Sequence, residues 1–588
     1  MKAKYILSGV FVAVLTILSS CSDFFEQESE HVTFTDKMHL NSPSDTIYSL
    51  IGIISKMQAL GDRTILLGEA RGDLVDVTSA TSADLRELAQ FDVKDDNIYN
   101  SPRDYYAVIN NCNLYIAKAD TALKDNRNKN IFIREYAAVK AYRAWTYLQL
   151  AINYGRVPFY TEPLLTKEQS DATYETKDIV DLCNWLANDI APLANEEYPV
   201  LGKIGITDSR FLYFPINIVL GDLNLWAGNY KAAALAYYKA ITTVNGPNSF
   251  YPISSSSVAW DGTGTWSKIN DTWSNLSISE VYYNNRELIT MIAGDSIPSD
   301  GNYSQLRGIF NSMPENNYKV SLVPSQAMKD ISAEQVYCQI TEDGDTIYAP
   351  RNLSDNRAGD LRLSASWLLQ QNFSYNDRQI DLQRIMKHQT RNIHIYRRAT
   401  LYLRLAEALN RAGYPHFAYQ ILASGVNDKV IANTVLPCCS TAADSAFVSQ
   451  FSFPGTSNSG YQVVDFSIPS QAYNTIGLHS RGSGWSQANI YYQMPDDSTL
   501  NAADRLAYQI DKVEKMIVDE GALEFAFEGT RYYDLLRVAL RRNDPSFLAN
   551  HIYNRRGADR VSEMKSEIKK DLMNTKNWFL NWNGKIGY

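Results

Sequence analysis

Apolar and small residues recur at helical spacing along much of this chain, and Gly and Pro mark where each run stops. The clearest run has one apolar face, made of Ala137, Ala138, Ala141, Ala144, Trp145, Leu148, Leu150 and Ala151. Small residues on such a face allow a neighbouring helix to approach closely. Gly155 and Pro158 then end the pattern. The spacing predicts a buried helix packed against others.

A repeated helical pair is the strongest indication of architecture. Residues 217–245 follow the 34-residue tetratricopeptide pattern, in which two helices pack through small and aromatic side chains. The matching positions are Leu220 and Gly221 in the first helix, Gly228 and Tyr230 in the turn, and Ala233, Tyr237 and Ala240 in the second helix. A second copy at the same spacing contains Tyr402, Leu405, Ala406, Gly413 and Ala418, with Pro415 displacing the turn tyrosine. We therefore expect a mainly α fold, a superhelix of tetratricopeptide-type pairs, mainly over residues 103–243 and 396–427.

Two long segments differ from this helical texture. Residues 245–395 and 440–500 are rich in Ser, Asn, Asp, Gly and aromatic residues. Short β-like runs such as 287–292 occur there, and Asp343-Gly344-Asp345 predicts a hairpin turn. We expect irregular loop excursions with minor β structure, and unusually long loops tend to carry function. A C-terminal helix is expected over about 502–542.

The N-terminal segment has the pattern of an export signal. Lys2 and Lys4 precede an uncharged, mostly apolar run over 5–18. Such a run rises only about 21 Å as a helix, which is shorter than the roughly 30 Å hydrocarbon core of a bilayer. We therefore expect residues 1–20 to be a signal peptide that is removed.

Cys21 follows Leu18-Ser19-Ser20, and this sequence resembles the lipobox of bacterial lipoproteins. The resemblance implies that Cys21 becomes the lipidated first residue of one mature domain, residues 21–588. The acidic stretch over 22–30 would then be a flexible tether and part of a surface-export signal. The alternative is an ordinary signal peptide followed by a chance cysteine.

Charge and cysteine content narrow the possible partners. The net charge is −9, and removal of 1–20 takes away two lysines and no acid, which leaves about −11. Nucleic-acid-binding proteins usually carry a basic patch, so no nucleic-acid partner is expected. Five cysteines remain after Cys21, so at least one is free or bonded to another molecule.

No catalytic or metal-binding constellation stands out. Seven histidines are present without a His-Glu-x-x-His motif, and His388 and His394 are spaced wrongly for one helical face. Gly-x-Ser-x-Gly and phosphate-loop motifs are missing, and the Ser-x-x-Lys matches at 562–565 and 566–569 lack their companion motifs. We therefore expect no catalytic residue, no metal and no cofactor.

Aromatic clustering within the first excursion is more informative. Trp260, Trp266 and Trp273 lie close together in a segment rich in Ser, Asn and Asp, and Tyr282 follows. Sugar rings stack their C–H faces on aromatic planes, while Asn, Asp and Arg bind the hydroxyls. The alternative is that these tryptophans anchor a long loop to the helical body.

Three stretches together resemble the SusD/RagB-type lipoproteins. Residues 140–158 are similar to the early helix of that family, and 398–413, with Ala-Glu-Ala-Leu-Asn at 406–410, to a later one. Residues 524–537 resemble its Phe-Glu-Gly-x-Arg-x-x-Asp-Leu motif. The usual segment after the second helix is replaced at 423–427. With the lipobox and the helical pairs, the resemblance covers nearly the whole chain.

The resemblance implies a surface-exposed lipoprotein of the outer membrane that is not an enzyme. Such proteins capture oligosaccharides, or in some members peptides, and sit on a SusC-like TonB-dependent transporter. Capture of an oligosaccharide or polysaccharide for uptake is therefore the leading hypothesis. Capture of a peptide or glycopeptide is the alternative, and a surface glycan hydrolase is less favoured because no acid/base or nucleophile motif is present.

The resemblance also bears on individual residues. Glu528, Arg531 and Asp534 lie three apart, so Arg531 is expected to bridge both acids on one helical face. A sugar site is expected where two sets of loop residues meet on one face. The first set is Arg71, Asp73 and Tyr99, and the second is Trp266, Trp273, Tyr282, Asn302 and Tyr303.

Overall fold

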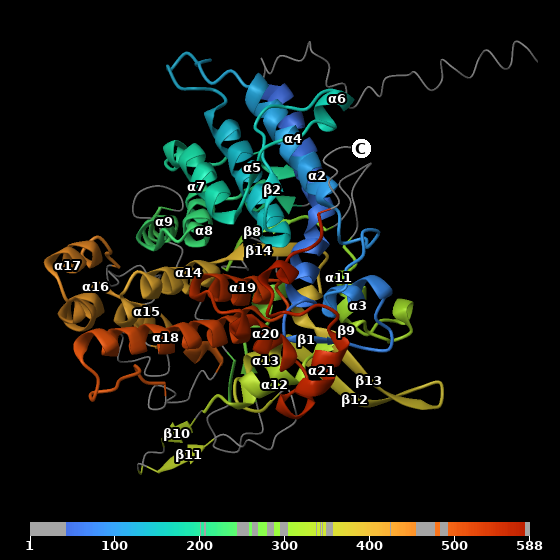
Figure 1. Ribbon diagram of the computed structural model, residues 1–588, viewed down its shortest axis with the longest axis vertical. Coiled ribbons are helices and arrows are strands. Elements are labelled where there is room, and N and C mark those ends of the chain that lie inside the picture. Colours follow the sequence, from blue (N-terminus) through green and yellow to red (C-terminus); the bar gives the residue numbers. More distant parts are fainter. Residues whose placement is uncertain are drawn as a thin grey trace, which may run out of the picture.

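The computed structural model is mainly helical with small β elements, of which β8 and β14 lie among the helices and β10 and β11 lie at an edge (Figure 1). It describes residues 43–582 except 200, 205–206, 244–257, 261–268, 279–286, 295–303, 337, 341–342, 344, 349–356, 424, 454–476 and 483–491. Cys21, the signal segment and the acidic tether lie outside the described residues. The longer helices are α2 (Pro43–Glu69), α4 (Pro102–Lys118), α5 (Ile133–Tyr154), α7 (Ile179–Ile190), α8 (Ile216–Ala227), α9 (Tyr230–Thr242), α14 (Arg398–Arg411), α15 (Pro415–Ala423), α18 (Ala502–Phe525), α19 (Arg531–Arg542) and α20 (Pro545–Tyr553).

The shorter helices connect and cover this body. They are α3 (Ala83–Ala89), α6 (Lys167–Ser170), α10 (Asn275–Ile278), α11 (Leu306–Phe310), α12 (Gln326–Ala333), α13 (Arg362–Ser366), α16 (Asp428–Val430), α17 (Ala442–Val448) and α21 (Val561–Glu567). Among the described residues, no helix has both the length and the apolar character that a membrane span requires.

The first predicted helical pair is confirmed. Helices α8 and α9 pack against each other, and the turn between them begins at Gly228, whose φ of 83° suits glycine. A Cβ at Gly221 would lie 2.4 Å from the ring of Tyr237, so only glycine lets this ring fill the groove. The small and aromatic positions of the pattern therefore mark real packing contacts.

The second pair is confirmed by the same features. Helices α14 and α15 are joined through Gly413, which has a φ of 97°, and Ala406 and Ala418 are fully buried. Helix α14 also packs on α9, so the two pairs meet directly although they are far apart in sequence.

The early apolar helix is α5, and almost its whole length from Ala137 onward is buried. It ends at Gly155, where φ is 76°. A Cβ there would lie 3.1 Å from the ring of Phe579. The C-terminal segment therefore closes over the end of α5.

The strands form two-stranded antiparallel sheets, which agrees with the expected minor β content. The pairs are β1 (Val75–Val77) with β9 (Leu322–Pro324), β2 (Val157–Pro158) with β3 (Thr176–Lys177), β4 (Lys203–Ile204) with β5 (Thr207–Asp208), β6 (Val258–Trp260) with β7 (Ile269–Asp271), β8 (Leu288–Ile292) with β14 (Ile393–Arg397), β10 (Cys338–Ile340) with β11 (Thr346–Tyr348), and β12 (Trp367–Tyr375) with β13 (Arg378–Ile385). Strands β10 and β11 flank Asp343, so the hairpin predicted there is confirmed.

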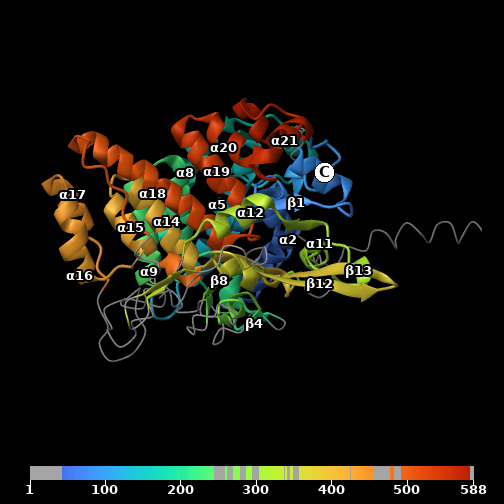
Figure 2. The same cartoon turned by 90° about the horizontal axis from the view of Figure 1, so that it is seen from below.

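The excursion over 245–395 is more regular than expected. Strands β12 and β13 form a hairpin that extends beyond the helical body (Figure 2). Its two turn residues, Asn376 and Asp377, have φ of 49° and 60°, which suits a two-residue hairpin turn. Sequence analysis did not predict this hairpin, although the pair Asn376-Asp377 lies between its two strands.

The single C-terminal helix expected over 502–542 is wrong in one respect, because the structure divides it into α18 and α19. Phe527 and Gly529 have positive φ between them. A Cβ at Gly529 would lie 2.4 Å from the carbonyl oxygen of Thr64 in α2. Close approach to α2 therefore explains the break.

Glu69, at the end of α2, is fully buried beside this break and accepts a hydrogen bond from the Gly529 N–H at 2.8 Å. Burial raises the pKa of Glu69 to about 8, so the folded state holds a proton that the unfolded state loses near pH 4.5. The contribution of Glu69 to the free energy of unfolding should therefore fall by about 1.4 kcal/mol per pH unit as the pH rises between these values.

Replacing Glu69 with Gln should remove this dependence and stabilise the protein at pH 8 relative to the wild type. Urea denaturation of both proteins from pH 5 to pH 8 measures the difference, in which other titrating groups cancel. Parallel pH profiles for the two proteins would contradict the assignment.

Candidate functional site

The early-loop residues Arg71 and Asp73 lie in the turn after α2 and are each 1 % exposed. The Arg71 guanidinium stacks 4.2 Å from the ring centroid of Tyr532, and its Nε donates to the Leu67 carbonyl at 2.8 Å. Both Asp73 oxygens accept from Arg531, at 2.6 and 2.9 Å. Burial alone would raise the pKa of Asp73, but Arg531 lowers it below its ordinary value.

This burial contradicts the expectation that Arg71 and Asp73 lie on an exposed sugar-binding loop. It also corrects the expected role of Arg531, which pairs with Asp73 and bridges neither Glu528 nor Asp534. Helix α19 begins only at Arg531, so Glu528 is not on its face. Glu528 pairs with Arg397 and Lys387, and Arg531 with Asp73, so these two side chains join distant segments of the body, whereas Asp534 pairs within α19 with Arg537.

Tyr99, the third residue of that set, is half-buried and packs against the core. Burial raises the pKa of its hydroxyl to about 12, so it is a neutral hydrogen-bonding group. Of the early set, Tyr99 alone retains exposed surface.

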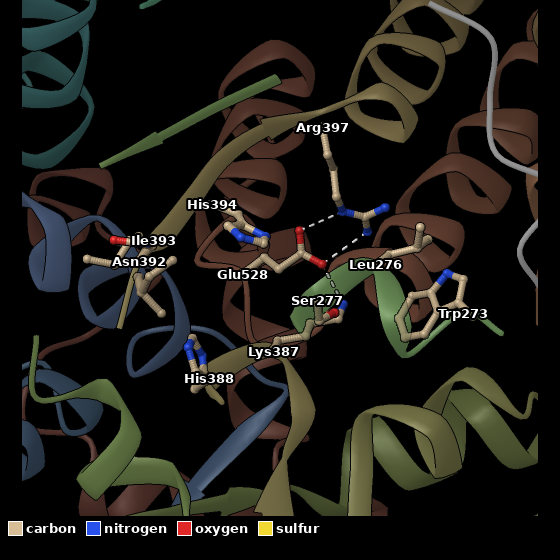
Figure 3. A pocket seen from close by; sticks show the side chains of 11 residues that line it. Trp273, Leu276, Ser277, Lys387, His388, Asn392, Ile393, His394, Arg397 and Glu528 are labelled. Atoms are coloured by element: carbon tan, nitrogen blue, oxygen red, sulfur yellow. Dashed lines mark hydrogen bonds and ion pairs between the residues drawn. The ribbon is translucent and has the colours of Figure 1, made fainter. Parts of the chain in front are cut away.

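Trp273 is 2 % exposed and belongs to a small apolar cluster with Val258, Leu276, Leu361 and Ala365. Figure 3 shows it at the edge of a small cavity, on the same side as Leu276 and Ser277. This burial contradicts its predicted role in an exposed platform and favours the alternative, an anchor that holds the first excursion on the body.

Lys387 provides the polar wall beside Trp273. Its ammonium lies 4.8 Å from the ring centroid of Trp273 and 2.5 Å from Glu528. Burial lowers the pKa of Lys387 to about 8, although Glu528 opposes the shift. The cavity holds about 20 Å³, enough for about one water molecule, so it is no site for a sugar.

Arg397 and Glu528, which line this cavity, belong to a buried network of charged residues. Arg397 bonds both Glu528 and Glu524, and its Nε to Glu528 bond is 2.8 Å (Figure 3). Glu524 also pairs with Arg362 and Arg481, each at 2.8 Å. Burial would raise the pKa of Glu524, but the three arginines hold it well below its ordinary value. Because each carboxylate is already paired, the network is suited to joining segments and not to proton transfer.

Four predicted site residues, Trp266, Tyr282, Asn302 and Tyr303, lie outside the described residues. The two predicted sets also make separate contacts where they are described: Asp73 bonds Arg531, whereas Trp273 contacts Lys387. Among the described members of the two sets, no contact joins the early set to Trp273.

A larger aromatic cleft lies elsewhere and was missed by sequence reasoning. It has a volume of about 800 Å³ and lies where the ends of α5, α8 and α19 and the start of α7 meet the C-terminal segment. We name it the aromatic cleft after its four partly exposed rings, Trp226, Tyr230, Phe579 and Trp582. The aromatic residues near the C-terminus were a signal for it, but their distance in sequence from Trp226 hid the juxtaposition.

Comparison with known structures identifies this arrangement of helical pairs. A SusD-superfamily protein of Bacteroides vulgatus is 16 % identical, with a TM-score of 0.57 over 92 % of this chain and 96 % of the other. The chain has the SusD-superfamily fold. A second such protein, from Bacteroides thetaiotaomicron, is 15 % identical, with a TM-score of 0.51 over 90 % of this chain and 97 % of the other. No protein-family model matches the sequence, and no curated protein matches it.

The three motif stretches have structural roles within this SusD-superfamily fold. Residues 140–158 form the end of α5 and the strand after it, 398–413 form α14 and its turn, and 524–537 cross the α18–α19 break. Glu524 and Arg537 in the last stretch are buried in ion pairs. The motifs therefore mark the packing of the body.

Proposed function

We propose that this protein binds an oligosaccharide or polysaccharide at the cell surface, without cleaving it, for uptake through a SusC-like TonB-dependent transporter. The observation that carries the proposal is the SusD-superfamily fold, which extends over 92 % of the chain. The absence of a catalytic motif in the sequence supports the non-catalytic part.

The proposal includes an anchor in the outer membrane. Lipidation of Cys21 would hold the folded body at the surface, and Leu18-Ser19-Ser20 before it supports processing there. Two or more acyl chains give stable attachment where one is marginal. Among described residues, the ring of Tyr99 remains a proposed sugar contact, and Trp266, Tyr282, Asn302 and Tyr303 remain proposed on sequence grounds alone.

Native electrophoresis through gels that contain single polysaccharides tests the binding function. The soluble body, residues 22–588, should be retarded by at least one polysaccharide, and the polysaccharide should keep its chain length. Product release would favour the hydrolase hypothesis. Binding of peptides with no retardation in any gel would favour peptide capture.

A further inference from the structure

We propose that the aromatic cleft binds an acidic oligosaccharide, whose sugar rings lie against the aromatic side chains and whose carboxylates face the arginines. This inference rests on the proposed function, because it assumes that the ligand is a glycan, and it adds the charge class and the place of binding.

The cleft has the size and rigidity of a ligand site. Its volume of about 800 Å³ falls within the range of about 300–1,000 Å³ that is common for ligand pockets. Trp582 makes edge contacts with Tyr106 and Tyr154, each at 5.6 Å between ring centroids. Phe579 lies over Gly155. The wall formed by the C-terminal segment is therefore held by the body.

The other aromatic residues of the cleft, Trp226 and Tyr230, are held by cations. The Arg537 guanidinium lies 5.2 Å from the ring centroid of Trp226, and the Arg411 guanidinium lies 5.8 Å from that of Tyr230. Stacking between a cation and an aromatic ring orients both groups. Aromatic planes from two parts of the chain are thus fixed in the lining of the cleft, and such planes are suited to stacking with sugar rings.

The charges that line the cleft are mostly positive. They come from Arg156, Arg411, Arg537, Arg541 and Lys576, against the single acid Asp178. Among the described residues, the carboxylates that pair with Arg411 and Arg537, namely Glu407, Glu514 and Asp534, do not line the cleft. They line a separate small cavity, which both arginines also border. The cations therefore lie between these carboxylates and the cleft, in a protein whose net charge is −9.

Arg411, which borders both the cleft and the small cavity, has a guanidinium nitrogen without a hydrogen-bond partner among the described residues. Its side chain is 1 % exposed, and this nitrogen is Nη1. Burial lowers the pKa of Arg411 because Glu407 and Glu514 only partly offset the loss of water. A ligand carboxylate would add an acceptor for this guanidinium beside its two carboxylate partners, Glu407 and Glu514.

Polygalacturonate and its fully methyl-esterified form are matched probes, because the two chains differ in charge and share the same sugar ring. Titration calorimetry should show that the wild-type protein binds the acidic form at least about tenfold more tightly, and that added NaCl weakens this binding. Equal affinity for the two forms would overturn the inference. Equal binding of polyglutamate would overturn it too, because the cleft would then select charge and not sugar.

Leu540 borders the cleft and is 39 % exposed. A substitution at this position therefore changes the cleft without disturbing the core. Leu540→Glu adds a carboxylate to the cleft and should weaken binding of polygalacturonate by about tenfold or more. Leu540→Gln, of similar size and uncharged, should change it by less than about threefold. Leu165→Glu, an exposed position that does not line the cleft, is the charge control and should match the wild type.

Melting curves establish that each variant is folded before its binding is compared. Unchanged binding of polygalacturonate by Leu540→Glu would overturn the cleft assignment and leave the proposed function standing. Failure of the wild type to bind any glycan would instead overturn both.

Discussion

Replacing Glu524 with Gln is expected to lower the free energy of unfolding by about 3–5 kcal/mol. Glu524 is fully buried and its two oxygens pair with Arg362, Arg397 and Arg481 at 2.6–2.8 Å. Removal of the charge leaves three buried guanidinium groups with too few carboxylates, and burying an uncompensated charge is costly. Urea denaturation at neutral pH measures the loss.

A control separates this effect from the mere loss of a carboxylate. Glu197 is exposed and pairs with Arg134 at the surface, so Glu197→Gln should change the free energy of unfolding by less than about 1 kcal/mol. Equal stability of Glu524→Gln and the wild type would show that the network contributes little to holding α18 against the excursions.

The second large effect is expected for Trp273→Ala, which should lower the free energy of unfolding by about 3–5 kcal/mol. The ring is buried against Val258, Leu361 and Ala365 and stacks with Lys387, so its removal leaves a cavity beside a buried cation. Thermal and urea denaturation both measure the loss.

Trp273→Phe tests whether Trp273 stabilises the protein through the packing of its ring and not through its indole N–H. Among the described residues the indole Nε1 has no hydrogen-bond partner, so Phe should recover most of the stability. Tyr348→Ala, at an exposed ring, is the matched control and should be nearly neutral. If Trp273→Ala kept the stability of the wild type but lost glycan binding, the result would contradict the anchor role. It would favour the sequence-based prediction that Trp273 is part of an exposed sugar-binding platform.

The helical pairs could be predicted because their determinants are local. Gly221 and Tyr237 lie in adjacent helices joined by one turn, so the spacing of small and aromatic residues records the contact itself. The same holds for Gly413 and Ala418 in the second pair. Periodicity and turn residues were sufficient for this part of the fold.

The pairing of charges could not be predicted, since it joins residues far apart in sequence. Arg531 was expected to bridge acids three positions away, but its partner Asp73 is 458 positions away. Spacing on a helix limits only the pairs that the helix itself can form. The backbone break at Phe527 and Gly529, which removes Glu528 from that helix, depends on contact with α2.

The exposure of individual aromatic side chains also could not be predicted from the sequence. A Ser- and Asn-rich segment indicates a surface loop, yet Trp273 within it points into the body. The aromatic cleft was missed for the opposite reason, because it joins Trp226 to Phe579 and Trp582 from the far end of the chain. The burial of Trp273 and the contact between distant segments at the aromatic cleft both depend on tertiary packing, which no local sequence pattern indicates.

Binding of a glycan without cleavage is the central property proposed for this protein. Titration calorimetry with each polysaccharide that retards the protein, followed by size-exclusion chromatography of the recovered polysaccharide, measures both parts in one sample. We expect saturable binding and an unchanged elution profile. Shortened chains in the recovered material, or no binding to any polysaccharide tested, would contradict the proposed function.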